Sequence, residues 1–462
     1  MNSTESSQPT PGQNYNRRLR RLTTIFAVIV VAVAIVAGFT GYEIRAVSTP
    51  TSSATSVSLT YFDDLAPSES SFMSSSVIPL FEHQYPNVTV VYSDISATAM
   101  VNEVEALEQG HDVGTTVIAE DNMVIGELVY GGYLMNMSSF ASSIEPSTMI
   151  PSMAGIAQYE VKAFGGTYFI PLRANVPLVW YNATALTAAG LHHPPANTAQ
   201  LMSDAQTLDS FYHGGQVMFQ GHGGASTPTE LFQWLTQFGG NPIAFNDTGD
   251  IHAFQYLYNL SAYFNPSYTS GYWGSYTGLA NGAYSILDYQ WPYIYSNLVG
   301  LGMPNSAIGV YAGPNGTVNS DHIIGGDVLA IPKGVTNLWA AQTFSQFLLS
   351  TPVQQMFIEN LSWPAVNQAA YTGLNASLSK TYGAIESALS NPVFRPPVPW
   401  ITEWNTLMDN AWSTIIVNHG SYASIASVLS NEHQQLYNYL VANFGQTTAT
   451  EYNEGMFGPL IV

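Results

Sequence analysis

The chain contains no cysteine and few charged residues. Asp, Glu, Lys and Arg make up only 9% of its 462 residues, whereas soluble domains usually carry about a quarter. Without disulfides, a folded protein of this size must be held together by its hydrophobic cores alone. Hydrophobic residues account for 46% of the chain, which is ample for such cores and excludes a globally disordered protein.

Positive charge is the scarcest property of the sequence. Lys and Arg number 10 against 31 Asp and Glu, which gives a formal net charge of -21. Nucleic acid is therefore not expected as a partner, because phosphate binding needs a basic face. Half of the basic residues lie within the first 45 positions, and the rest of the chain holds only Lys162, Arg173, Lys333, Lys380 and Arg395.

The shortage of cations also bears on the working pH. A carboxylate paired with a cation has a depressed pKa, and the stability that it contributes is lost as the pH falls through that pKa. A chain with few cations has little of this stability to lose, and below about pH 4 most carboxyls become neutral. We therefore hypothesise that the protein works in acid; the alternative is an acidic surface suited to neutral pH.

Motifs of common enzyme classes are missing from the sequence. It has no G-x-S-x-G, no H-E-x-x-H and no G-x-x-x-x-G-K-[ST], and its histidines show no metal-ligand spacing. The run from Gly221 to Gly224 is similar to an esterase oxyanion loop, but without a nucleophile elbow we interpret it as a turn. Acidic pairs could serve a glycosidase, yet the order of the chain favours binding. We expect no catalysis, no metal and no cofactor.

The N-terminal region predicts a membrane segment. A basic stretch within residues 1–21 precedes an uncharged apolar run at 22–42, and about 20 such residues can cross a bilayer as a helix. The basic residues place residues 1–21 in the cytoplasm and the remainder outside. The run is either a cleaved signal or a retained anchor, and its length favours the anchor. A Ser/Thr-rich linker follows at 43–56, and eight of the Asn-X-Ser/Thr sequons lie in the external part, where glycosylation is possible.

Strand and helix patterns alternate at the start of the globular part. Such alternation predicts an α/β fold with a mostly parallel sheet. Helical spacing dominates from residue 395, and residues 441–462 are predicted to form a poorly structured tail. The expected strands are 57–62, 88–92 and 113–119, with helices at 69–82 and 98–109 between them.

A series of short motifs then follows in a fixed order along the chain. The most informative segment, residues 168–202, predicts two strands and two helices separated by a proline turn. The motifs are Asp112-Val113, Gly131-Gly132, Ile170-Pro171, Tyr181-Asn182, Ala189-Gly190-Leu191, Pro194-Pro195, Thr198, Gly325-Gly326, Pro332-Lys333-Gly334, Thr351-Pro352, Pro364-Ala365 and Arg395-Pro396.

In type, order and spacing, this series resembles the family 1 extracellular solute-binding proteins, the group of maltose-binding protein. The resemblance implies a two-lobed α/β fold of the periplasmic-binding-protein type, with the ligand cleft between the lobes. It places the chain crossings near 171–177, 309–314 and 355–365. The implied N-lobe comprises 57–172 and 314–355, and the implied C-lobe comprises 173–313 and 356–440.

The same resemblance implies a sugar or oligosaccharide ligand, delivered to an ABC permease and its ATPase subunits. Sugars stack on aromatic rings, and aromatic residues make up 13% of this chain. Two alternatives stay open. One is a non-sugar solute such as a polyamine, which suits the acid excess. The other is a surface adhesin or envelope protein that merely retains the fold.

Candidate polar ligand contacts lie where strands end. In open α/β sheets, ligands bind beyond the carboxyl ends of the strands. These ends carry Asp63, Asp64, Glu120 and Asp121, although helix caps or solvated loops would also use such carboxylates. The first crossing holds two further candidates, Arg173 and Asn175. The arginine could bind ligand or bridge the lobes.

The remaining candidates come mainly from the resemblance. A segment similar to the family's sugar-stacking segment holds Asp288 and Trp291, and an aromatic loop upstream holds Trp273. For each tryptophan the alternative is core packing. The other candidates are Trp363, Trp400 and Asp327, which follows two glycines that are expected to let a ligand approach closely.

Overall fold

A computed structural model describes residues 56–144, 149–271, 274–375 and 378–461. The predicted membrane segment at 22–42 and the candidate Trp273 lie outside these residues. Within the described ranges, no helix is both long and apolar enough to cross a membrane.

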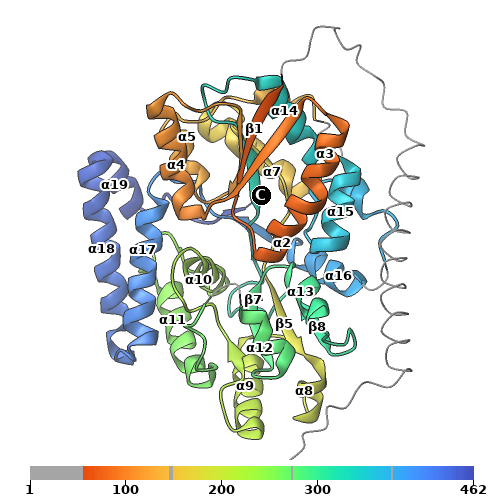
Figure 1. The fold of residues 1–462 in the computed structure, drawn as a ribbon. Coiled ribbons are helices and arrows are strands. Elements are labelled where there is room, and N and C mark those ends of the chain that lie inside the picture. The colour runs from red at the N-terminus through yellow and green to blue at the C-terminus, as the bar shows by residue number, and fades with distance from the viewer. Residues whose placement is uncertain (1–55, 145–148, 272–273, 376–377, 462) are drawn as a thin grey trace, which may run out of the picture. The chain divides into compact units, whose positions relative to one another are not determined.

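The first sheet is built from the strands that the sequence predicts, together with one that returns later in the chain (Figure 1). Its first three strands pair in parallel, but β10 pairs antiparallel with both of its neighbours. Strand β4 therefore runs in the same direction as the first three strands. The predicted mostly parallel sheet holds for these four strands, and β10 is the one strand of this sheet that runs the opposite way. The order is β2 (Val88–Asp94), β1 (Val57–Asp63), β3 (Thr116–Asp121), β10 (Asp327–Ala330) and β4 (Phe169–Pro171).

Helices cover this sheet and complete what we call the first lobe. The predicted helix at 69–82 forms as α2 (Pro67–Phe72) and α3 (Ile78–Gln84), joined by a π-helical turn at Met73–Val77. Helix α14 (Leu338–Leu348) contacts β1 and β3, and the apolar side chains between them form a continuous core. The other helices of this lobe are α4 (Ala97–Gly110), α5 (Ile125–Tyr130), α6 (Ser138–Ala141), α7 (Pro151–Phe164) and α15 (Thr351–Leu361).

The second lobe is organised around a sheet of order β6 (Val217–Met218), β7 (Ile286–Gln290), β5 (Leu178–Asn182) and β8 (Ile308–Tyr311). Asn182 caps the helix that follows β5, since its side chain accepts a hydrogen bond from the Ala185 amide. The helices of the second lobe are α8 (Ala183–Ala188), α9 (Thr198–Tyr212), α10 (Ser226–Gln237), α11 (Thr248–Leu260), α12 (Ser275–Asn281), α13 (Ile294–Gly300) and α16 (Ser379–Ala388), with a 3-10 turn at Ser261–Tyr263.

A small third sheet lies along a crossing between the lobes. Its order is β12 (Leu460–Ile461), β11 (Pro392–Phe394) and β9 (His322–Ile324). Strand β9 leads through Gly325 and Gly326 into β10 of the first sheet. An earlier crossing joins β4 to β5, and a later one carries the 3-10 turn Gln368–Tyr371. The lobe boundaries drawn from the sequence stay a prediction.

The C-terminal region is folded, which corrects the predicted tail at 441–462. Helices α17 (Ile401–Trp412) and α18 (Ile425–Asn443) pack against α10 and α11, and α19 (Gly445–Asn453) packs on α18. A π-helical turn at Ser413–Val417 and a 3-10 turn at Tyr422–Ser424 connect the first two. Ala449 and Tyr452, three residues apart on one helix face, are buried there. Burial of this face, rather than intrinsic helix propensity, accounts for α19.

Tyr452 should therefore contribute strongly to stability. Its ring stacks on His433 and meets Trp400 edge-on. Tyr452→Ala is expected to lower the free energy of unfolding by about 3 kcal/mol or more, as for other large aromatic truncations in a core. Thr447→Ala on the exposed side of α19 should change it by less than about 0.5 kcal/mol. Chemical denaturation of both variants checks this, and equal small losses would show that α19 is dispensable.

Candidate binding cleft

A cleft of about 270 Å³ lies between residues of the two lobes. Polar side chains dominate its wall, with Trp291 and Tyr293 as the aromatic contribution. The first lobe and the crossings supply Asp64, Glu69, Ser96, Glu120, Asp121, Arg173, Asn175, Gly326 and Asp327, and the second lobe supplies Gln220, Gly223, Gly224, Ala225, Ser226, Thr229, Trp291 and Tyr293.

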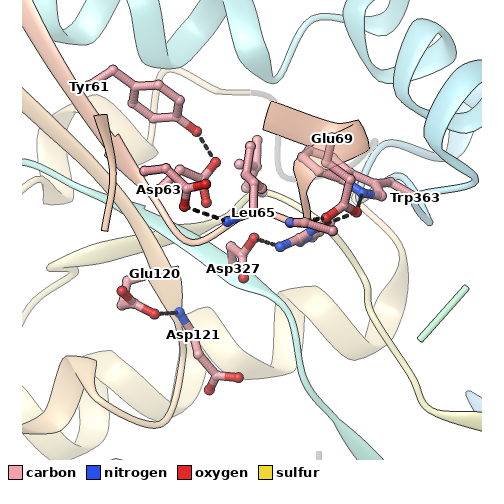
Figure 2. A network of polar contacts seen from close by, with 12 residues as sticks. Tyr61, Asp63, Leu65, Glu69, Glu120, Asp121, Asp327 and Trp363 are labelled. Atoms are coloured by element: carbon pink, nitrogen blue, oxygen red, sulfur yellow. Dashed lines mark hydrogen bonds and ion pairs between the residues drawn. The ribbon is translucent and has the colours of Figure 1, made fainter. Parts of the chain in front are cut away.

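Arg173 is the centre of a polar network in this wall. Figure 2 shows the network and labels the partners Glu69, Asp327 and Trp363. Its guanidinium pairs with the carboxylate of Asp327 and lies 3.5 Å from Oε1 of Glu69. Its Cζ stands 4.1 Å from the centroid of the Trp363 ring, a cation–π geometry. The Trp363 indole donates in turn to Glu69, whose other oxygen accepts the Ala66 amide at 2.8 Å. One buried cation thus holds together residues from α2 and from two crossings.

Burial sets the protonation of the carboxyls around this arginine. It raises the pKa of Asp327 to about 7 although Arg173 lowers it, and it raises the pKa of Glu69 and of Asp63. Burial also works against the charge of Arg173, but Asp327, Glu69 and Asp63 outweigh it and raise the pKa of the guanidinium. The arginine therefore stays charged, while its carboxyl neighbours gain protons at higher pH than exposed carboxyls do.

Glu120 and Asp121, at the end of β3, have different surroundings. Oε1 of Glu120 accepts the Asp121 amide at 2.6 Å, whereas its buried Oε2 meets no donor among the residues that the structure describes. Burial raises the pKa of Glu120 well above its ordinary value. Asp121 is engaged by Arg395, whose Nη2 donates to its two carboxylate oxygens at 2.7 and 2.9 Å. Arg395 also donates to Thr229 of α10 at 2.8 Å and so links the two lobes.

The opposite wall is residues 220–229, which we call the cleft loop. Its turn is fixed from inside, because the Gly223 amide donates to Thr227 Oγ1 and that hydroxyl donates to the Gln220 carbonyl. The Gly224 amide donates to Asp409 of α17 at 2.6 Å. Burial raises the pKa of Asp409 to about 6, although that amide lowers it.

Trp291 reaches the cleft because Gly325 has no side chain. A Cβ atom at position 325 would stand 2.4 Å from the Trp291 indole, and one at Gly326 would stand 2.4 Å from the Arg173 carbonyl oxygen. Gly326 also has a φ of 114°, which favours glycine. The sequence predicts that these glycines allow a ligand to approach; in the structure they allow protein groups to approach.

The structure brings seven of the twelve predicted contacts into the cleft wall: Asp64, Glu120, Asp121, Arg173, Asn175, Trp291 and Asp327. Whether they touch a ligand stays a prediction.

Four candidates are placed elsewhere, which corrects their expected position. Asp63 is buried behind the wall, where it accepts a hydrogen bond from the Tyr61 hydroxyl. Asp288 is buried in β7 and accepts the Trp234 indole N–H at 2.9 Å. Trp363 lies beneath Arg173, and Trp400 packs in the second core against Tyr452. None of the four is among the residues that line the cleft.

Sequence reasoning missed the glutamate on α2, Ser96, Tyr293 and the whole cleft loop. The glycines at 221–224 were the available signal for that loop, because a glycine-rich turn before a helix brings the backbone close to whatever faces it. The missed wall residues are Glu69, Ser96, Gln220, Gly223, Gly224, Ala225, Ser226, Thr229 and Tyr293.

Comparison with known families agrees with this two-lobed arrangement. Residues 62–355 match the family described as bacterial extracellular solute-binding protein. The chain belongs to this family. It is accordingly a binding protein and not an enzyme.

Solved structures share the fold at low sequence identity. The GacH receptor of Streptomyces glaucescens, solved unliganded and with acarbose, has a TM-score of 0.72 at 18% identity, covering 82% of this chain and 98% of that one. Maltose-bound MalE3 of T. maritima has a TM-score of 0.72 at 18% identity, covering 82% and 100%. A Listeria monocytogenes ABC substrate-binding protein in complex with cycloalternan reaches 0.70 at 17%, covering 83% and 99%. No curated protein sequence matches the chain.

Removing Arg173 should destabilise this solute-binding protein in a pH-dependent manner. Arg173→Met leaves Glu69 and Asp327 without their cation, and breaking a buried ion pair in this way typically costs about 3–5 kcal/mol. At pH 3 the loss in unfolding free energy should be clearly smaller than at pH 7, because these carboxyls are then neutral. Denaturation at both pH values measures the difference, with exposed Lys162→Met as the matched control. An equal loss at both pH values would contradict a charge-balancing role.

Proposed function

We propose that this protein captures a sugar or oligosaccharide between its lobes and delivers it to the permease of an ABC importer. The observation that carries the proposal is the cleft itself, whose lining combines five carboxyl side chains with Trp291. Carboxyl and amide groups bond to hydroxyls, and an aromatic ring offers a surface on which the C–H face of a sugar can stack. The proposed contacts are the seven predicted residues in the cleft wall.

The charge of the cleft favours a neutral ligand over an anionic one. Both arginines at the cleft are engaged by carboxylates of the protein, Arg173 by Asp327 and Arg395 by Asp121. Glu120 Oε2 is a buried acceptor that a ligand hydroxyl could satisfy. Sugar phosphates and uronic acids would add negative charge beside these carboxyls, so we propose that they are excluded.

The solved relatives support the sugar class. The ligands bound in these structures are acarbose, maltose and cycloalternan, and the proteins share the fold with this chain. A polyamine is the second candidate ligand, favoured by the excess of carboxyls in the cleft wall. A surface adhesin would use the same fold without binding a free solute.

We further propose that the apolar run at 22–42 anchors the binding domain on the outer face of the membrane. Delivery to a permease then needs only lobe closure beside the membrane, and ATP hydrolysis belongs to partner subunits. The external sequons are consistent with a glycoprotein, because none of their eight asparagines is fully buried.

A ligand screen tests the proposed function. Thermal unfolding of the protein is followed with maltose-type oligosaccharides, sugar phosphates and polyamines. A ligand at 1,000 times its Kd should stabilise the protein by about 4 kcal/mol. We expect a neutral sugar to raise the Tm and sugar phosphates to leave it unchanged.

Variants of the cleft then test the site. Trp291→Ala should remove most of the ligand-dependent shift, whereas Trp339→Ala, an exposed tryptophan of α14 that is not in the cleft wall, should retain it. A shift with polyamines alone would replace the ligand class, and a folded protein that responds to no solute would favour the adhesin.

We also propose that the protein works at acidic pH. Burial raises the pKa of Asp288 to about 7, of Asp327 to about 7 and of Asp409 to about 6, whereas unfolded carboxyls titrate near pH 4. Between these values the folded protein holds protons that the unfolded chain has released. The resulting stability is fully present below about pH 4 and is lost as the pH rises towards 7.

The free energy of unfolding should therefore increase when the pH is lowered from 7 to 4, by about 3 kcal/mol or more. Urea denaturation at one-unit intervals of pH measures this slope. A free energy of unfolding that is flat or falls over this range would contradict the acid proposal.

A further inference from the structure

Two carboxyl side chains, Glu230 and Asp288, lie next to each other inside the second lobe. Glu230 belongs to α10 and is 2% exposed, and Asp288 belongs to β7 and is 0% exposed. The Trp234 indole, one helical turn after Glu230 on α10, donates to Asp288 and so places Asp288 on the same side of that helix as Glu230. Burial raises the pKa of Glu230, and the charge of Asp288 raises it further. Neither lines the cleft.

The contacts of the pair imply a shared proton. Oε2 of Glu230 accepts the Gln220 amide at 2.9 Å, and Oδ2 of Asp288 accepts the Trp234 indole N–H at 2.9 Å. The remaining oxygens, Oε1 of Glu230 and Oδ1 of Asp288, are buried and meet no donor N–H or O–H of the described residues. Two bare carboxylate oxygens would repel each other, whereas one proton between them satisfies both.

Among the residues that the structure describes, none of the groups packed around the pair supplies a compensating cation. The titratable side chains that face it are Tyr256 of α11, Tyr289 of β7 and Tyr311 of β8. His322 of β9 meets the Tyr289 ring, and burial lowers its pKa, so it is neutral. Arg395 donates to Thr229, the residue before Glu230, but the positive charge of Arg395 is paired with Asp121.

Glu230 connects directly to the cleft loop. The Gln220 amide donates to it, the Gln220 side-chain amide donates to the Tyr289 carbonyl at 2.8 Å, and the Gln220 carbonyl accepts from Thr227. Gln220 and Thr229 both line the cleft. The position of the loop therefore depends on the side chain that Glu230 presents.

We infer that Glu230 and Asp288 are positioning residues of the binding cleft, which share a proton and so hold the cleft loop in its ligand-binding position. This inference rests on the proposed ligand-binding role of the cleft. With the proton in place, Glu230 Oε1 donates to Asp288 and Oε2 accepts from Gln220. When the last proton leaves, the two carboxylates separate, and Glu230 can no longer hold the Gln220 amide.

The test compares the wild-type protein with Glu230→Gln, whose amide donates to Asp288 and whose carbonyl accepts from Gln220 at every pH. Binding of a maltose-type oligosaccharide is measured by calorimetry from pH 4 to pH 9. Wild-type affinity should fall by about tenfold for each pH unit once the shared proton is lost. The variant should match the wild type at pH 4 and lack that fall. Glu160→Gln, a buried carboxyl of α7 outside the cleft wall, is the matched control and should keep the wild-type profile.

A readout without ligand keeps this inference separate from the proposed function. The indole N–H resonance of Trp234, assigned with Trp234→Phe, reports on Asp288 directly. In the wild type it should show an alkaline titration step that is missing in Glu230→Gln. If that step is present in both proteins, or if both lose affinity alike as the pH rises, the shared proton does not position the loop. If the step behaves as expected but no sugar binds at any pH, the proposed function fails and the proton pair stands.

Discussion

The shortage of positive charge is the constraint on which the rest of this structure depends. Outside the N-terminal region, five basic residues serve a chain with a formal charge of -21. Two of them are buried: Arg173, which lines the cleft, and Arg395, which pairs with Asp121 of the cleft wall. A buried guanidinium is costly to desolvate, and it is retained only where several acceptors surround it. Arg173 meets that condition through Asp327, Glu69 and the Trp363 ring, and Arg395 through Asp121, Asn122 and Thr229.

Both buried arginines lie where the lobes join, and each connects different elements at this junction. Arg173 follows β4 at the first crossing, and Arg395 follows β11 of the third sheet. Arg173 fixes the crossings relative to α2, whereas Arg395 contacts β3 on one side and α10 on the other. The charges that shape the cleft wall are thus the same charges that hold the lobe junction. A solute that altered either ion pair would act on the relative position of the two walls, which is the quantity that a closing binding protein must control.

The sequence predicted the parts of this arrangement that depend on local pattern. Strands β1 and β2 follow from their β-branched and aromatic residues, and the acidic pairs at strand ends reach one edge of the sheet because parallel strands end together. It could not predict which partner a side chain meets across the fold. Trp363 was expected to face a ligand, but its indole bonds to Glu69, which lies 294 positions earlier. Asp288 likewise bonds inside the protein, to the Trp234 indole of α10. Local sequence pattern cannot predict that α10 lies beside β7.

The cleft loop and α19 were missed for a related reason. Each gains its structure from contacts with distant elements, the loop from Glu230 and Asp409 and the helix from the core around Tyr452. Short segments of small polar residues carry little intrinsic preference, so tertiary burial decides their conformation.

We infer that protons, more than lysine or arginine, neutralise the buried carboxyls of this protein. A buried carboxyl can be neutralised by a cation or by a proton, and only the second choice depends on pH. Glu120, Glu160, Glu230 and Asp250 are all buried, and burial raises the pKa of each well above its ordinary value. In acid, neutralisation by a proton adds no cost in conformational entropy, because the proton comes from solvent and no long side chain has to be ordered. At neutral pH the same carboxyls oppose folding. We therefore propose one physical explanation for the composition and the buried carboxyls, in which the stability of the fold and the geometry of the proposed binding site depend on protonation.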